Sequence, residues 1–253
     1  LSGRWFPGLD GTAAIVIGVT AGILSSIGFG LINGILVGKL SAPPLIATLG
    51  TMTLYTGIGM ALTGGKGVTG LPETFTNFGI IEVAGVPLIF LLFMLTVVIL
   101  AFILSHTTFG RKIYLLGSNH TAAKFSAIDT EKLTVSTFTF IGFLAGLAGM
   151  IIISRVNSAK VGYGEAYLLQ SLLVCVVGGI HPDGGRGRIA GVLAAIILMQ
   201  ILASAFNVWR FSPYAKKLIW GFMLIVVMGL NYISDLHLQR KIYRQAKERE
   251  GTV

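Results

Sequence analysis

The side chains in this sequence that could do chemistry are few, and two of them lie in one glycine-rich stretch. The segment GGIHPDGGRG at 178–187 brings His181 close to Asp183. Both are metal-ligand types, but two ligands are too few for a site, so we predict no metal. Two interpretations of the stretch remain. It is an irregular backbone lining a water-filled pathway, or a tight cytoplasmic turn with Arg186 and Arg188 anchored at lipid headgroups.

The sequence lacks the short motifs that signal enzymes. It contains no G-x-x-x-x-G-K-[ST] phosphate-binding loop, no H-E-x-x-H and no G-x-S-x-G. We therefore expect that the protein is not an enzyme and uses no cofactor. Any ATP hydrolysis connected with it would take place on another polypeptide.

A few polar residues interrupt the apolar runs. Asn33, Gln170 and Ser171 could offer hydrogen bonds to the hydroxyls of a solute, or bond to neighbouring helices, as such groups more often do. The candidate translocation-pathway residues are Asn33, Gln170, Ser171, Gly178, Gly179, His181 and Asp183.

These residues must be positioned by membrane helices. The chain has 54% hydrophobic and 11% charged residues, against about 25% charged in a soluble domain. A hydrocarbon core needs about 20 apolar residues per helix. Seven runs qualify, the fifth being a short span or half of a broken helix: 12–37, 44–63, 86–105, 133–154, 164–180, 189–208 and 217–234. The sequence predicts an all-α, polytopic transmembrane helix bundle forming a single domain over 1–253.

The net charge of +9 does not indicate a nucleic-acid partner, because the basic residues lie in short links between apolar runs. Such links carry topology signals. More Lys and Arg residues fall on the side that holds 110–132 and the C-terminus, so we predict that this side is cytoplasmic. The chain begins as a loop without a signal peptide, and we expect that the first helices of the bundle are absent from it.

Glycines recur at four-residue spacing within two runs. Gly30, Gly34 and Gly38 form one series, and Gly142 and Gly146 repeat the spacing later. Small residues on one helix face allow close approach of backbones in lipid. We predict tight packing within the bundle, with a specific dimer face as the alternative.

The longest polar stretch is GRKIYLLGSNHTAAKFSAIDTEK, residues 110–132. Within it, Ser118 or Asn119 is a candidate N-cap of a short helix. Ala122 and Phe125 are three residues apart and share a face of that helix. Phe125 is either folded back onto the bundle or inserted into a groove of a partner.

This stretch resembles the cytoplasmic loop of permease subunits in the ribose-type, or monosaccharide, family of ABC importers, within the branched-chain amino acid and ribose permease superfamily. The matching segments are FGRKIYLLGSNHTAAKFSAID, FLAGLAGMI and VVGGIHPDGGRGRIAGVL. The resemblance implies a type II-like importer permease with about ten helices per copy. It also implies a second permease copy in a homodimer or heterodimer, a cytoplasmic ATP-binding subunit, and a periplasmic or lipid-anchored solute-binding protein.

In that family the loop is the coupling helix, which docks into a groove of the ATPase. The positions that correspond here are Gly117, Asn119, Ala122, Ala123, Phe125 and Ser126. The family's usual glycine after serine is Ala127 in this chain, which suggests a helix that runs slightly longer before turning. A rigid short helix would transmit a movement of the ATPase to the bundle.

The link NVWRFSPYAKK combines aromatic and basic residues at a predicted interface. Such residues are common anchors in membrane lipid. The alternative is a docking surface for acidic patches of the binding protein, formed by Trp209, Arg210, Tyr214 and Lys216.

The sequence thus predicts a multi-pass permease subunit of the bacterial inner membrane that imports a monosaccharide or a related small polyhydroxylated solute. The alternative function is an ion-coupled secondary transporter. That function would need intramembrane carboxylates, and Glu165 near the end of a run is a weak candidate.

Overall fold

The computed structural model describes residues 11–181 and 184–250, which are mostly helical. The predicted all-α class is confirmed. The chain divides into two compact units, Leu1–Gly164 and Glu165–Val253, and we describe each unit by itself. The single permease domain over 1–253 stays a prediction.

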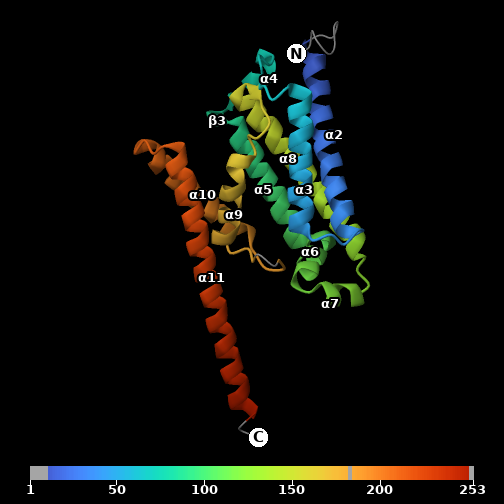
Figure 1. The fold of residues 1–253 in the computed structure, drawn as a ribbon, viewed down its shortest axis with the longest axis vertical. Helices are drawn as coiled ribbons and strands as arrows, with labels where there is room; N and C mark the ends of the chain where they lie inside the picture. Colours follow the sequence, from blue (N-terminus) through green and yellow to red (C-terminus); the bar gives the residue numbers. More distant parts are fainter. Residues whose placement is uncertain (1–10, 182–183, 251–253) are drawn as a thin grey trace. The chain divides into compact units, whose positions relative to one another are not determined.

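The first unit is built of helices, with very short strands at its loops (Figure 1). Its elements are α2 (Gly11–Gly38), α3 (Pro44–Thr63), β1 (Val68–Thr69), α4 (Glu73–Phe78), β2 (Glu82–Val83), β3 (Val86–Pro87), α5 (Leu88–His106), α6 (Thr108–Ser118), α7 (His120–Phe125), α8 (Thr130–Val156) and β4 (Ser158–Ala159). The second unit contains α9 (Glu165–Val177), α10 (Ile189–Val208) and α11 (Pro213–Glu250).

Six helices in the described part of the chain are long and apolar enough to cross a bilayer. They are α2, α3, α5, α8, α10 and the first part of α11, Pro213–Asn231. The remaining predicted run, 164–180, corresponds to α9, which has 13 residues. At about 1.5 Å per residue it is too short to span the hydrocarbon core as a single helix.

Proline and glycine set the ends of the spans as their backbone preferences require. Pro44 is the first residue of α3, where its missing N–H would be unbonded in any case. Gly64 ends α3 in the left-handed region at φ +62°, which only glycine adopts without strain. Pro87 precedes α5 in the same way as Pro43 precedes α3.

The links of the first unit alternate between its two ends (Figure 1). Val37, Gly38 and residues 41–44 line one cavity together with residues of α6, α7 and the start of α8. We call this the inner end, since the sequence predicts it to be cytoplasmic. At the other end, the outer end, β1 pairs with β4 in an antiparallel register of Val68 with Ala159.

A small cap closes the outer end of α8. The hydroxyl of Ser154, which is buried, donates a hydrogen bond to the carbonyl of Phe75 in α4 at 2.6 Å. Gly79, just after α4, lies against the backbone of Arg155. These contacts fix the long link between α3 and α5 onto the end of α8.

The second unit has its own apolar core. Residues from α9, α10 and α11 are buried against one another: Leu173, Val174, Ala195, Met199, Phe206 and Trp220. The Phe206 and Trp220 rings meet edge to face at 5.5 Å between centroids. This geometry is the one that aromatic quadrupoles favour.

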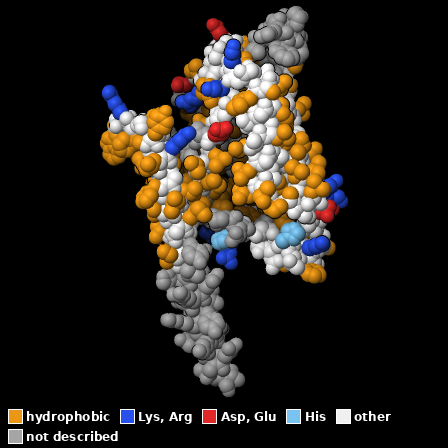
Figure 2. Space-filling view, viewed as in Figure 1, with side chains coloured by type: hydrophobic (Ala, Val, Ile, Leu, Met, Phe, Trp, Pro, Cys, Tyr) orange, Lys and Arg blue, Asp and Glu red, His pale blue; other side chains and the backbone are white. Residues whose placement is uncertain are grey.

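Elsewhere, large apolar side chains are exposed along most of the helices. No residue of α5 is buried, and Val98 in its middle is 63% exposed. Figure 2 shows hydrophobic side chains covering the helices, with charged groups mostly near their ends. A soluble monomer rarely exposes such continuous apolar surface, whereas a bilayer or a neighbouring subunit would cover it.

Candidate functional site

The polar segment between α5 and α8 begins with a tight corner. The Thr107 hydroxyl caps α6 by accepting a hydrogen bond from the N–H of Gly110 at 3.2 Å. An added Cβ at Gly110 would lie 2.5 Å from the Ile103 carbonyl oxygen and from the Leu104 Cα. The corner therefore requires glycine, because the two helices approach through their backbones.

Helix α6 is amphipathic and was not identified as a separate helix from the sequence. Its half-buried residues Phe109, Ile113 and Leu116 follow i, i+4, i+7 spacing, while Arg111 and Lys112 are exposed. That spacing is the signal that could have revealed it. Since α6 separates the short helix from the membrane helices, it sets where that helix is held.

Helix α7 is the predicted short helix, and Asn119 is its N-cap. The Asn119 side-chain oxygen accepts a hydrogen bond from the N–H of Ala122 at 3.0 Å. The hydroxyl of the other candidate, Ser118, bonds back to the Leu115 carbonyl at 2.9 Å. Ala122 is itself exposed on this helix.

Two residues of α7 differ sharply in their surroundings. Ala123 is 2% exposed, so its face of the helix rests on the protein. The Phe125 side chain is 88% exposed, which excludes the interpretation that it folds back onto its own unit. Burying such an aromatic side chain against a partner would be worth about 1.5–3 kcal/mol.

The end of α7 corrects one sequence expectation. The helix does not run longer because Ala127 replaces glycine; it ends at Phe125, and Ala127 turns the chain in the left-handed region at φ +56°. The N–H of Ile128 bonds to the Ala123 carbonyl, and that of Ala127 to the Lys124 carbonyl, both at 3.3 Å. These two bonds satisfy the last carbonyls and hold the turn despite the strain of a Cβ.

The remaining predicted coupling residues belong to the same turn and its base. The Ser126 hydroxyl donates to the Ala122 carbonyl at 2.9 Å. Gly117, near the end of α6, lines a cavity of about 560 Å³ at the inner end together with His120 and Lys124 of α7. The structure thus brings all six predicted residues into one compact segment.

The start of α8 is fastened directly to this segment. The Asp129 carboxylate caps α8 by accepting the N–H of Lys132 at 3.0 Å, and it pairs with the Lys132 ammonium at 2.9 Å. The backbone hydrogen bond, followed by the side-chain bond, lowers the pKa of Asp129. Thr130 and Leu133 in this first turn are buried, so α7 is linked to α8 by a fixed turn of few residues.

Along its length, α8 packs against α2 through glycine. An added Cβ at Gly30 would lie 2.5 Å from the Phe138 carbonyl oxygen, and one at Gly142 would lie 2.6 Å from the Ser26 carbonyl oxygen. The Ser26 hydroxyl donates to the Gly142 carbonyl at 2.7 Å. Gly38 continues the contact to the carbonyl of Glu131, at the start of α8.

We call this contact the α2–α8 seam, formed by Gly22, Ser26, Gly30, Gly34 and Gly38 of α2 with the facing residues of α8. The predicted close packing of glycines is present here, within one chain.

The predicted pathway residue Asn33 belongs to the first unit. Its side-chain oxygen accepts a hydrogen bond from the buried hydroxyl of Thr51 at 2.6 Å, which joins α2 to α3. This is the interhelical bond that the sequence left open as an alternative. The other predicted pathway residues belong to the second unit.

In the second unit, Gly178 and Gly179 have different roles. An added Cβ at Gly178 would lie 2.8 Å from the Val192 Cα, so it allows α9 and α10 to meet. Gly179 turns the chain at φ +78°. The N–H of His181 bonds to the Arg186 carbonyl at 3.1 Å. Asp183 lies outside the described residues.

Gln170 and Ser171 lie on α9. Gln170 is half-buried, and the exposed Ser171 donates its hydroxyl to the Leu168 carbonyl one turn earlier at 2.9 Å. The pathway role of these residues stays a prediction. Among the described residues, no group of three or more potential metal ligands occurs.

The predicted docking residues lie in the link between α10 and α11. Trp209 is 67% exposed and Tyr214 is 84% exposed. The Lys216 ammonium donates to the Asn207 side-chain oxygen, which holds it across the link. Arg210 adopts a left-handed conformation at φ +55°.

Comparison with known proteins identifies the family. Residues 5–228 match the family described as branched-chain amino acid transport system, permease component. The chain belongs to this family of transport permeases. The resemblance found in the loop motif is confirmed, and we describe the protein as a multi-pass permease of the plasma membrane.

Individual relatives are import permeases. The chain is 34% identical to the ribose import permease protein of Bacillus subtilis over 91% of this chain and 71% of that protein. It is 31% identical to the L-arabinose transport system permease protein of Escherichia coli, over 86% of this chain and 66% of that protein. It is 32% identical to the autoinducer 2 import system permease protein of Yersinia enterocolitica, over 91% of this chain and 64% of that protein.

The chain therefore spans about two thirds of the length of these curated relatives. No solved structure matches it.

Proposed function

We propose that this permease forms half of the membrane pathway of an ABC importer that moves a monosaccharide or a related small polyhydroxylated solute into the cytoplasm. It performs no covalent chemistry. Separate ATPase subunits drive it, a second permease copy completes the pathway, and a solute-binding protein delivers the solute. The family and the named substrates of its relatives, which are ribose, L-arabinose and autoinducer 2, support this proposal over an ion-coupled transporter.

The observation that carries the proposal is the exposure of Phe125 on a short helix fixed at both ends. Asn119 caps the start of α7, two backbone bonds close its end, and Ala123 packs against the protein. An aromatic side chain that is 88% exposed on such a rigid helix suits insertion into a groove of the ATPase.

The link to the bundle supports transmission of movement. The turn at Ile128 leads directly into the capped start of α8, and the α2–α8 seam ties α8 to α2 through close backbone contacts. A push on α7 would therefore move two membrane helices as a body, as interfaces of this kind do in rigid-body transitions.

The link between α10 and α11 is our proposed contact for the solute-binding protein. The exposed rings of Trp209 and Tyr214 lie near the basic Arg210 and Lys216 in the sequence of this link. Such a surface would contact acidic patches on the partner and steer its approach. The same side chains also suit the alternative role, as an anchor in the lipid interface.

The ATPase proposal is tested by co-purification. The full chain is co-expressed with a candidate ATPase subunit, and Phe125→Asp is compared with Leu40→Asp. Leu40 is an apolar residue at the inner end, 68% exposed, outside the polar segment. We expect Phe125→Asp to abolish co-purification and Leu40→Asp to preserve it. Equal retention by both variants would refute the coupling role of Phe125.

A further inference from the structure

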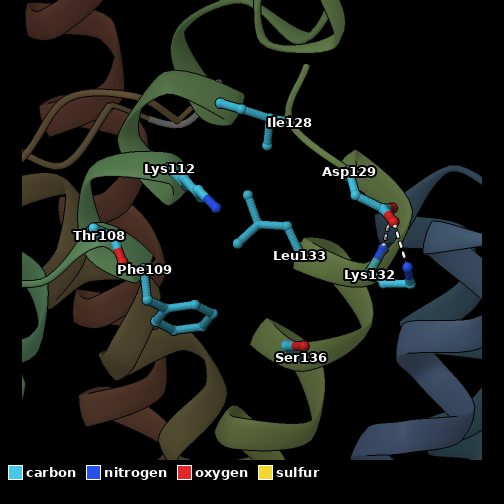
Figure 3. Close-up of a pocket in the computed structure, with 8 residues that line it drawn as sticks. All are labelled: Thr108, Phe109, Lys112, Ile128, Asp129, Lys132, Leu133 and Ser136. Carbon is cyan, nitrogen blue, oxygen red and sulfur yellow. Dashed lines mark hydrogen bonds and ion pairs between the residues drawn. The ribbon is translucent and has the colours of Figure 1, made fainter. Parts of the chain in front are cut away.

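A second cavity at the inner end is separate from the proposed contact of Phe125. It has a volume of about 340 Å³ and lies between α6 and the start of α8 (Figure 3). Its lining residues are Thr108, Phe109, Lys112, Ile128, Asp129, Lys132, Leu133 and Ser136. The cavity shares Ile128 and Asp129 with the turn that links α7 to α8, but neither the proposed contact of Phe125 nor the predicted solute pathway uses it.

The cavity combines positive charge with hydroxyl groups. In Figure 3 the Lys112 side chain extends from α6 toward the space beside Leu133. The carboxylate of Asp129 is already paired with Lys132 at 2.9 Å, whereas Lys112 forms no ion pair among the described residues. Two lysines against one aspartate give the lining a net positive charge, with one ammonium free to bind an anion.

The backbone adds to this positive potential. Helix α6 begins at the cavity with Thr108, and the N-cap Asp129 and first-turn Lys132 of α8 also line it. Each helix start carries a partial positive charge that suits an anion, while the Gly110 and Lys132 N–H groups are already bonded to Thr107 and Asp129. Thr108 and Ser136 supply hydroxyl donors from the two sides of the cavity.

The depth of the cavity suggests where its ligand comes from. The apolar span of α5 ends at His106, two residues before Thr108, and that of α8 begins at Thr130. The cavity thus lies at the adjoining ends of two candidate spans, where the headgroups of a bilayer would meet the protein. Phe109, Ile128 and Leu133 make part of its wall apolar, which would contact the glycerol and acyl region of a lipid and give nothing to a free anion.

We propose that the α6–α8 cavity binds a phosphate group, supplied by the headgroup of an anionic phospholipid in the surrounding leaflet. The ammonium of Lys112 pairs with the phosphate, the hydroxyls of Thr108 and Ser136 orient it, and the apolar wall holds the adjoining glycerol. A bound headgroup would brace α6 against α8. This inference does not depend on the proposed function, because it concerns lipid and not the ATPase.

The test measures lipid binding to the purified full chain in detergent. Native mass spectrometry follows titration with short-chain phosphatidylglycerol, with phosphatidylethanolamine of the same chain length, and with inorganic phosphate. We expect tighter binding of phosphatidylglycerol than of phosphatidylethanolamine, and weakening of about fivefold in Lys112→Gln. Lys112→Arg should keep the binding.

Lys39→Gln is the matched control, since Lys39 is an exposed lysine at the same end outside this cavity. Equal effects of the two glutamine variants, or no preference for the anionic lipid in wild type, would overturn the proposal. If inorganic phosphate binds as tightly as phosphatidylglycerol with the same dependence on Lys112, the phosphate site stands and the lipid source is wrong. Size-exclusion profiles verify that each variant is folded.

Discussion

The α2–α8 seam and helix α7 are two regions of one unit with opposite surfaces. In the seam, backbone meets backbone, and a Cβ added at Gly30 or Gly142 would lie within 2.6 Å of a carbonyl oxygen. On α7, the Phe125 side chain is 88% exposed and touches little of its own unit. The two regions also differ in length: the seam extends along two membrane helices, whereas α7 has only six residues.

The difference separates two properties in this permease: the seam holds two helices rigidly together, and α7 presents a side chain for the proposed contact with a partner. Small residues remove the space between two helices, so that they move together. Short capped helices, by contrast, can present an apolar side chain without an apolar core beneath it. The proposed transmission of movement needs both, and they are joined through the turn at Ile128 and the cap at Asp129.

The largest effect is expected from filling the seam. Gly142→Leu would force α2 and α8 apart, and overpacking of this kind costs about 3 kcal/mol. The control is Gly149→Leu on the same helix, where an added Cβ meets nothing within 4 Å. Unfolding of both variants by denaturant in detergent measures the difference. Equal stability of the two would show that the seam is not close-packed.

A smaller effect is expected from removing the cap of α7. Asn119→Ala loses the bond to the Ala122 N–H and should destabilise the helix by about 1 kcal/mol. Hydrogen exchange of the α7 amides in the full chain measures this local stability. Ser118→Ala serves as the comparison, because its hydroxyl bonds to α6. Faster exchange in Ser118→Ala than in Asn119→Ala would reassign the cap.

The turn after α7 allows a change in the opposite direction. Ala127 adopts a left-handed conformation at φ +56°, and such a conformation costs a residue with a Cβ about 1–2 kcal/mol. Ala127→Gly removes this strain, but part of the gain is lost because glycine has more backbone entropy to lose on folding. We expect a net gain of about 0.5 kcal/mol, seen as slower exchange of the same amides. Ala122→Gly, in the helix itself, should instead speed exchange. A loss of protection in Ala127→Gly would contradict the turn geometry.

The smallest effect concerns the junction between the two regions. The hydrogen bonds from Lys132 lower the pKa of Asp129 below its usual value near 3.8. The charge of Asp129 therefore stabilises the fold fully above about pH 3.8, and this contribution is lost as the pH falls through the lowered pKa. Asp129→Asn keeps a cap without the charge. The difference in melting temperature between wild type and variant should therefore be largest at about pH 6 and shrink below about pH 4. A constant difference would exclude a role for the charge.

Several features could be predicted from the sequence because they are local. Apolar run length gave the six long spans, and the polar types around Asn119 gave the short capped helix. The resemblance of the loop to a permease family followed from residue order alone. By contrast, α6 was missed because its apolar positions are interrupted by Arg111 and Lys112, so it did not stand out from the polar stretch.

Other features depend on contacts that the residue types do not reveal. The bond from Thr51 to Asn33 changes how that asparagine is interpreted, and the left-handed turn at Ala127 is held by bonds to Ala123 and Lys124 rather than by residue preference. The cavity beside Lys112 forms where α6 lies next to the start of α8. None of these contacts has a signature in the sequence pattern.

The sequence by itself determined that this chain spans a membrane, where its long helices lie, and which family it resembles, because these follow from hydropathy, capping types and residue order. Only the tertiary structure decided which glycine face meets which helix, that Phe125 is left uncovered by its own unit, and that Lys112 lines a cavity. The physical reason is that burial and close approach are properties of pairs of segments, and a single segment carries no record of its neighbour.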